Sequence, residues 1–359
     1  MINKRTKIFL GLILLVSLFV FINGKIPVIG RNFLYEEKDF SDGKKRMFSD
    51  LYRFCRVEYF REEIPYVSNP GNQNFPDSSE IFVFGDSYFN TMMDTINVPL
   101  ALQNITGKKI CNASEYKGMV LSSPISFLKR NNIKPGRRRI MVVETSERYS
   151  YNSALKLYLK QNDHFTFFHF KFQLSKYLRF DDLDYWLSNS VFTEMFINRK
   201  AGFYFNNFGV ISSEISEFSM SPKFLFYSEE TNFNNMRKPE SEISSISDNV
   251  NKLAEILDRD YNMSLIYLII PNKFTLYGKY ADSSYVYDNY IPKVYSRLNN
   301  NTNAVNLYEL YSKLKESNPA DYLYFTSDTH FNLRGREIAI NEIIKRINKI
   351  YNEKQDNGK

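Results

Sequence analysis

The chain has 359 residues, of which 43% are hydrophobic and 24% are charged. This composition excludes a disordered or low-complexity chain, and the length suffices for one large domain or two smaller ones. The formal net charge of +7 is compatible with nucleic-acid binding, but the basic residues are scattered. Their tightest cluster, Arg137-Arg138-Arg139, directly precedes a predicted strand, and no nucleic-acid-binding motif is present, so we expect no nucleic-acid partner.

The N-terminus carries an almost unbroken apolar run over residues 8–22, preceded by Lys4, Arg5 and Lys7. Such a run is either a secretory signal or a short membrane anchor. Because no Ala-x-Ala cleavage site follows, the sequence favours an uncleaved anchor within residues 1–30. The basic flank then places the N-terminus in the cytoplasm and the rest of the chain outside.

Residues 31–78 are polar and mixed in composition, which predicts a stalk or lead-in to the main domain at 79–350. Short apolar runs and helix-like segments then alternate, which predicts a three-layer α/β fold with a parallel central sheet. The predicted strands are residues 81–84, 109–111, 140–144, 265–270 and 304–307. Apolar residues at helical spacing predict helices over 246–257 and 333–350.

Residues 151–240 interrupt this alternation and predict an aromatic-rich insertion between the third and fourth strands. The insertion would cover the active site, form a partner surface, or pack as an irregular helical lid. His164 and His169 fall in it without a carboxylate-and-serine context, so we interpret both as packing or surface residues. We expect the tail at 351–359 to be frayed.

The two cysteines, Cys55 and Cys111, leave two alternatives open. They could form a disulfide in an oxidising compartment, or each could be a buried, unpaired hydrophobe. Their number and spacing do not fit a zinc site, and we expect neither a metal nor a cofactor.

The most informative motif is Gly85-Asp86-Ser87, which follows an apolar strand and precedes a predicted helix. That context places a serine hydroxyl on a strand-to-helix turn. A serine needs a base to become a nucleophile, and His330, two residues after Asp328, lies near the end of the chain. Because the carboxyl ends of parallel strands meet at one edge of the sheet, these side chains could form a catalytic triad. In the alternative interpretation, Ser87 and His330 merely cap helices.

Four sequence blocks together resemble the SGNH/GDSL superfamily, and in particular the SGNH-like polysaccharide O-acetyltransferases of the bacterial envelope, such as the alginate acetylation proteins. The blocks are residues 84–87, 142–149, 271–277 and 328–335. The resemblance implies a three-layer, flavodoxin-like SGNH fold. It also implies a polysaccharide acceptor, and a multi-spanning membrane acyltransferase that delivers the acyl group. The chain would then be a single-pass protein of the bacterial inner membrane, with its catalytic domain in the periplasm or outside the cell.

The sequence departs from the alginate-type pattern in three ways. The serine block precedes the Asp-x-His block, as it does in ordinary GDSL esterases. Phe331 stands where relatives usually carry tryptophan, and Glu144 and Glu147 stand where many hydrolases have a Gly-x-Asn-Asp block. We interpret Glu147 as the structural partner of a nearby cation.

Further site residues follow from the positions of loops after strands. The candidates for an oxyanion hole are the Ser87 N–H, the Gly118 backbone and the Asn112 side chain, although Gly118 and Asn112 could equally be ordinary loop and turn residues. Arg148 and Lys273 could bind an anionic sugar or steady a lid, or could be exposed charges without a specific role.

Three functions remain open from the sequence. The first is an envelope O-acyltransferase that moves an acyl group, most simply acetyl, to a glycan through acyl-Ser87. The second is a carbohydrate or lipid esterase with the same triad and water as the acceptor. The third is a non-catalytic protein that binds a polysaccharide or scaffolds a membrane complex.

Overall fold

The structure, a computed structural model, describes residues 38–39, 45–66, 76–90, 97–114, 121–155 and 191–357, together with Gly11 and Leu14. The predicted N-terminal anchor therefore lies almost entirely outside the described residues. Within the part of the chain that is described, no helix combines the length and the apolarity that crossing a bilayer requires.

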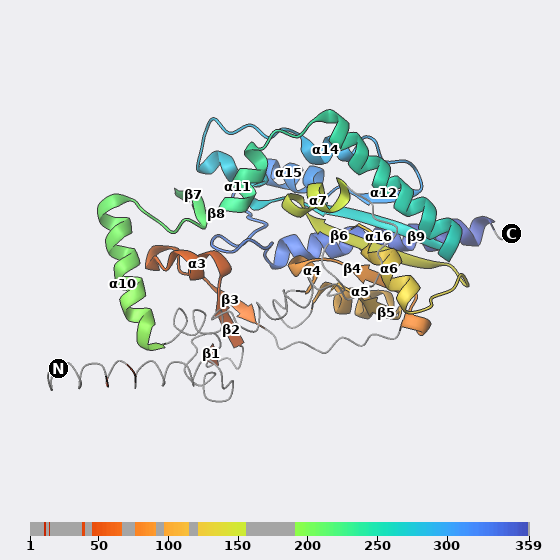
Figure 1. Ribbon diagram of the computed structural model, residues 1–359, viewed down its shortest axis with the longest axis horizontal. Helices are drawn as coiled ribbons and strands as arrows, with labels where there is room; N and C mark the ends of the chain where they lie inside the picture. The colour runs from red at the N-terminus through yellow and green to blue at the C-terminus, as the bar shows by residue number, and fades with distance from the viewer. Residues whose placement is uncertain are drawn as a thin grey trace, which may run out of the picture.

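Five parallel strands form the central sheet, in the spatial order β10-β9-β6-β4-β5 (Figure 1). All five strands predicted from apolar runs are confirmed. They are β4 (Ile81–Phe84), β5 (Ile110–Asn112), β6 (Arg139–Ser146), β9 (Met263–Ile270) and β10 (Thr302–Val305).

Helices cover both faces of this sheet, so the mixed α/β architecture is confirmed. The predicted helical stripes lie within α12 (Glu240–Tyr261) and α16 (Leu333–Asn357). Among the described residues after β4, the other helices are α4 (Ser87–Asn90), α5 (Val98–Thr106), α6 (Ser123–Arg130), α7 (Glu147–Leu155), α10 (Val191–Phe208), α11 (Ser228–Asn235), α13 (Lys273–Tyr277), η4 (Gly278–Tyr280), α14 (Tyr290–Tyr295) and α15 (Leu307–Ser317).

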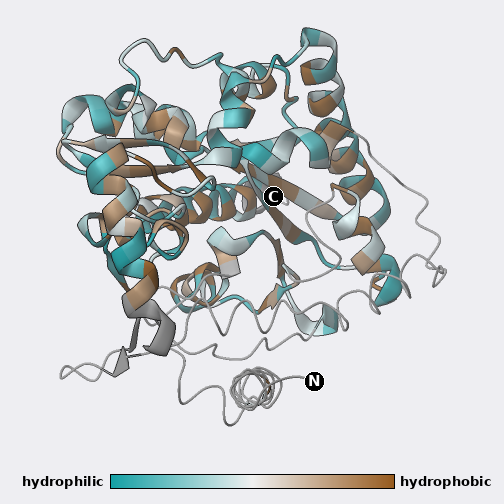
Figure 2. Ribbon diagram, turned by 60° about the vertical axis from the view of Figure 1, so that its left-hand side comes forward, coloured by the Kyte–Doolittle hydropathy of each residue, from teal (hydrophilic) through white to brown (hydrophobic). Residues whose placement is uncertain are grey.

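The pleat of each strand divides the core into two hydrophobic clusters. In β4, Ile81 and Val83 point to the face covered by α5, α15 and α16, whereas Phe82 and Phe84 point to the face covered by α6, α12 and α14. Figure 2 shows the hydrophobic strands running between helices whose outer faces are polar. A sheet buried on both faces explains why its strands appear in the sequence as continuous apolar runs.

The described part of the predicted lead-in is folded. It contains β1 (Lys38–Asp39), β2 (Lys45–Phe48), α3 (Asp50–Cys55), η2 (Glu58–Phe60), β3 (Glu63–Tyr66) and η3 (Pro76–Ser78), and its three strands form an antiparallel sheet. Leu51, Tyr52 and Phe60 pack against Ile215 and Leu225 in a third hydrophobic cluster. The lead-in is therefore anchored to a region that lies more than 150 residues later in the chain.

Between β6 and β9 the chain forms α7, α10, α11 and an antiparallel hairpin of β7 (Ile215–Met220) and β8 (Lys223–Tyr227). Figure 1 shows α10 standing away from the central sheet, with α3 between them. His164 and His169 lie outside the described residues. Cys55 and Cys111 are both buried, and neither is in a disulfide.

Candidate active site

Ser87 lies on a sharp turn between β4 and α4. β4 is buried along its whole length, and only two residues, Gly85 and Asp86, separate it from Ser87 at the start of α4. A Cβ atom at Gly85 would lie 2.6 Å from Glu144 Oε2 and 2.9 Å from Phe89 Cβ, so glycine is required by this close approach. The turn leaves the Ser87 side chain exposed at the carboxyl edge of the sheet.

Asp86 fixes the geometry of this turn. Its carboxylate accepts hydrogen bonds from the Tyr88 N–H at 2.9 Å and the Ser146 N–H at 3.1 Å, and its own N–H donates to Glu144 Oε2 at 2.8 Å. Burial, followed by the charge of Asp86, raises the pKa of Glu144 well above its ordinary value. Both effects favour the neutral acid of Glu144 over its carboxylate, which reduces the repulsion between the two neighbouring carboxyl groups.

The strand order places Ser87 at the point where the winding of the sheet reverses. From β4 the chain continues to β5 on one side, and then returns to β6 on the other side of β4. In open parallel sheets, ligands bind at the carboxyl ends of strands flanking such a reversal. Ser87 is therefore in the position where this architecture most often holds a reactive group.

The structure brings Ser87, His330 and Asp328 into one chain of contacts. His330 Nε2 lies 2.8 Å from Ser87 Oγ, and His330 Nδ1 lies 2.7 Å from Asp328 Oδ1. An ionised carboxylate only accepts hydrogen bonds, so Nδ1 carries the proton and Nε2 is free to accept the serine proton. This is the arrangement of a serine nucleophile, its base and the group that orients the base.

The electrostatics of the pair suit proton transfer. Burial by itself lowers the pKa of His330, but the charge and hydrogen bond of Asp328 outweigh it and raise the pKa above its ordinary value. Burial would raise the pKa of Asp328, but His330 and two backbone N–H donors lower it below its usual range. Asp328 therefore stays ionised, and its charge would stabilise an imidazolium at His330 if the ring took the Ser87 proton.

Two buried side chains hold the backbone of the loop that carries His330. The Lys273 ammonium group donates to the carbonyl oxygens of Asp328 at 2.7 Å, Thr326 at 3.1 Å and Phe325 at 3.4 Å. The Tyr88 hydroxyl donates to the Thr329 carbonyl at 2.7 Å. Lys273, for which a sugar-binding role is one expectation, is fully buried and bonded to the protein's own backbone.

The lead-in reaches the same loop from the other side. The Asp50 N–H donates to Asp328 Oδ2 at 2.8 Å, and the Asp50 carboxylate accepts from the Thr329 N–H at 2.8 Å and from the Thr329 hydroxyl at 2.5 Å. Glu62 accepts hydrogen bonds from the backbone and hydroxyl groups of Thr326 and Ser327. A region predicted as a stalk thus supplies two carboxylates to the candidate site.

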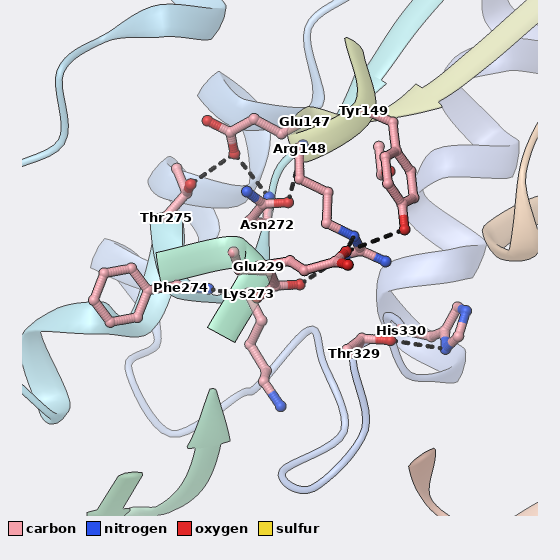
Figure 3. A network of polar contacts seen from close by, with 12 residues as sticks. Glu147, Arg148, Tyr149, Glu229, Asn272, Lys273, Phe274, Thr275, Thr329 and His330 are labelled. Carbon is pink, nitrogen blue, oxygen red and sulfur yellow. Dashed lines mark hydrogen bonds and ion pairs between the residues drawn. The ribbon is translucent and has the colours of Figure 1, made fainter. Parts of the chain in front are cut away.

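Arg148, the other residue proposed to contact substrate, is in a buried ion pair. Its Nη1 lies 3.0 Å from Glu230 Oε1, with side chains 8% and 0% exposed, and its guanidinium lies over the Tyr149 ring. Figure 3 shows Arg148 and Lys273 in the same neighbourhood as Thr329 and His330. The positive charge of Arg148 opposes the protonation of His330, since it lowers the pKa of the imidazole.

The remaining predicted residues either bond to residues other than the triad or lie outside the described residues. Asn112 pairs with Val83 on the neighbouring strand, and its side-chain oxygen accepts from the Ser114 N–H at 3.1 Å. Gly118 lies outside the described residues. Glu147 is expected from the sequence to pair with a nearby cation. Its hydrogen bonds come instead from neutral donors, among them the Thr275 hydroxyl at 2.6 Å.

One group of side chains has the spacing that a cation would need. Ligand atoms of Asp50, Asp328 and His330 all lie within 4.8 Å of one another. These atoms already bond to each other and to Thr329, and the imidazole links a carboxylate to Ser87 Oγ. The donor set therefore fits a proton relay better than a metal site.

The sequence interpretation missed Asp50, Glu62 and Tyr88. Ser49-Asp50 before apolar residues has the pattern of a helix start, which accounts for an aspartate at that position without any catalytic role. Asp50 lies 278 residues from Asp328 in the chain, so no local pattern connects them.

A scan against protein-family models gave no match, and searches of curated proteins and of solved structures gave no significant match.

Proposed function

We propose that this protein is a serine acyltransferase that works through an acyl-Ser87 intermediate. The observation that carries the proposal is the unbroken contact chain from Ser87 Oγ through the His330 ring to Asp328, with separations of 2.8 and 2.7 Å. Ser87 is exposed at the sheet edge, so an acyl donor can reach it. A helix cap would not require a histidine positioned between a hydroxyl and a buried carboxylate.

The geometry suggests the following sequence of steps. His330 Nε2 takes the proton of Ser87 Oγ as the oxygen attacks the donor's carbonyl carbon. The Ser87 N–H is at the first residue of α4, where no intrahelical acceptor exists, so it is suited to bind the developing oxyanion. The imidazolium then protonates the leaving group. An acceptor hydroxyl, deprotonated by His330, attacks acyl-Ser87 and regenerates the enzyme.

The acceptor and the fold family are part of the proposal. Counted in chain order, the sheet has the strand order 2-1-3-4-5, which is that of flavodoxin-like folds and supports the SGNH interpretation. From the resemblance we infer an O-acetyltransferase of an envelope polysaccharide. A multi-spanning membrane acyltransferase would supply the acetyl group outside the cytoplasm, and residues 8–22 would anchor the chain in the inner membrane.

An esterase is the second candidate, and the chain order of the motif favours it. Ser87 precedes Asp328 and His330, as in ordinary GDSL esterases. Transfer and hydrolysis share the same acyl-enzyme, and they differ only in whether a sugar hydroxyl or water attacks it.

The test is intact-mass measurement of the full chain after incubation with an activated acetyl ester. We expect one added acetyl group, located on Ser87 by peptide mapping, and none in Ser87→Ala. No acetylation of Ser87 in the folded wild-type protein would overturn the proposal. Acetyl-glycan formed in excess of free acetate identifies a transferase, and acetate alone identifies the esterase. Normal cellular acylation in a Ser87→Ala strain would instead support a non-catalytic role.

A further inference from the structure

The loop bearing the candidate base is completed by the lead-in, a segment far away in the sequence. The Leu51 and Tyr52 N–H groups donate to the Ser327 carbonyl at 3.1 and 3.3 Å, and the Ser49 and Ser327 hydroxyl oxygens lie 2.8 Å apart. Ser49, Ser327 and Asp328 are each at most 1% exposed. The N-terminus of α3 is thus docked on the Asp-Thr-His loop through buried polar contacts, which are costly to leave unpaired.

Within this contact, Asp50 touches every residue of the Asp-Thr-His motif. Its N–H donates to Asp328 Oδ2, the carboxylate oxygen that does not face the imidazole. Its two carboxylate oxygens accept from the N–H and the hydroxyl of Thr329. Its Oδ2 also lies 3.8 Å from His330 Nδ1, so a second carboxylate stands beside the imidazole.

We propose that Asp50 is a positioning residue of the acyl-transfer site, which fixes the orientation of Asp328 and His330 and adds a second negative charge beside the imidazole. The inference rests on the proposed function of Ser87, and it extends the relay from three residues to four. It also assigns a role to the lead-in: without this segment the base would lose both a hydrogen-bonded support and a charge.

The charges around Asp50 are consistent with this role. Asp328 and His330 face it from the loop, and Lys273 faces it from α13. Burial, followed by the charge of Asp328, raises the pKa of Asp50 to about 6, whereas His330, the Thr329 hydroxyl and Lys273 act in the opposite direction. The charge of Asp50 in turn raises the pKa of His330. Above pH 6 the ionised carboxylate thus makes His330 a stronger base, and below pH 6 this contribution is lost.

The test compares three variants of the full chain. In Asp50→Asn we expect acylation of Ser87 by an activated acetyl ester to fall about 10-fold to 100-fold, as when a catalytic group loses its exact placement. We also expect the acid limb of the pH–rate profile to move to lower pH, because the imidazole loses a neighbouring negative charge. Glu62→Gln loosens the same loop without removing a charge beside His330. It should therefore lower the rate of Ser87 acylation and leave the acid limb of the pH–rate profile at the same pH. Glu58→Gln, an exposed carboxylate of the same segment, should change neither.

Two measurements keep the inference falsifiable if the variants are poorly folded or inactive. In the wild type, both Asp50, whose pKa is about 6, and His330, whose pKa is raised, should influence the rate, so the acid limb should depart from a single titration; a limb described by one titrating group would overturn the inference. The His330 pKa in Asp50→Asn, followed by NMR, should be lower than in the wild type, and an equal value would overturn the role of the charge. A wild type that never acetylates Ser87 would refute the proposed function, whereas unchanged rates and limb in Asp50→Asn would refute only this inference.

Discussion

Ser87, the proposed nucleophile, and His330, its proposed base, are held in place by two different kinds of structure. Ser87 follows a buried strand whose position is set by a parallel hydrogen-bond ladder to β5 and β6. Residues 325–330 have neither helix nor strand geometry, and they are held instead by buried side chains from α4 and α13 and by a half-buried carboxylate of the lead-in. The strand before Ser87 is thus positioned by backbone hydrogen bonds, whereas the loop depends on a few polar side-chain contacts. The predictions below probe this difference.

The largest effect is expected where the loop meets the nucleophile. Asp328→Asn should reduce turnover of an activated acetyl ester by about 10⁴-fold, the size of the loss for the same change in a serine protease triad. The variant should fold nearly normally, because the amide keeps an oxygen that can accept from the Asp50 N–H. Turnover and thermal melting are measured together on the same protein.

The opposite pattern for Asp328→Asn would contradict a catalytic loop. If Asp328 merely caps a helix, the variant should lose about 1 kcal/mol of stability and keep its activity. Combining Ser87→Ala with His330→Ala should cost no more than either change alone, because the residues act as a unit.

Lys273→Met should loosen the loop without touching the reacting atoms. The substitution leaves three carbonyl groups without their ammonium donor, and we expect the free energy of unfolding to fall by about 2 kcal/mol or more. Acylation of Ser87 should fall about 10-fold, because the base is less well placed. Denaturant unfolding and acylation rates measure the two effects.

Lys279→Met is the matched control for Lys273, because Lys279 is exposed on the neighbouring η4 turn. Its free energy of unfolding should stay within about 0.5 kcal/mol of the wild type. Equal stability and activity of the two variants would mean that Lys273 does not support the loop.

Gly85→Ala probes the sheet edge. A methyl group would lie 2.6 Å from Glu144 Oε2, so either the turn or Glu144 must move. We expect a loss of about 1–3 kcal/mol, as for other overpacked sites, and slower acylation because Ser87 is displaced. Gly136→Ala is the control, since nothing lies within 4 Å of its added Cβ. A melting temperature equal to that of the control would show that the turn is looser than described.

The smallest effect on turnover is expected for Glu147, whose substitution probes the pH dependence of stability at the sheet edge. Burial is the main reason that the pKa of Glu147 is raised from 4.5 to about 7. Between these values the folded state binds more protons than the unfolded state, so this group's contribution to stability falls as pH rises and is constant above pH 7. Glu147→Gln should remove that slope, so its difference in unfolding free energy from the wild type should change between pH 4.5 and 7.

Glu255→Gln provides the control for this measurement, because it removes a carboxylate that is exposed on the protein surface. Turnover should change little in Glu147→Gln, since Glu147 accepts its hydrogen bonds from Thr275, Asn272 and Tyr287, none of which belongs to the triad. A large loss of turnover would mean that the sheet edge and the loop are coupled more tightly than their contacts indicate.

The sequence by itself determined the strands, the two long helices and the three residues of the candidate triad. Strands buried on both faces leave continuous apolar runs, and a serine after such a run or a histidine two residues after an aspartate is visible locally. The tertiary structure alone decided which groups support them. Asp50 and Glu62 look like ordinary polar residues of a lead-in, and Lys273 and Arg148 look like exposed charges. Each is defined by partners that are distant in the chain, and burying such groups is stable only when the whole fold brings those partners within hydrogen-bonding distance.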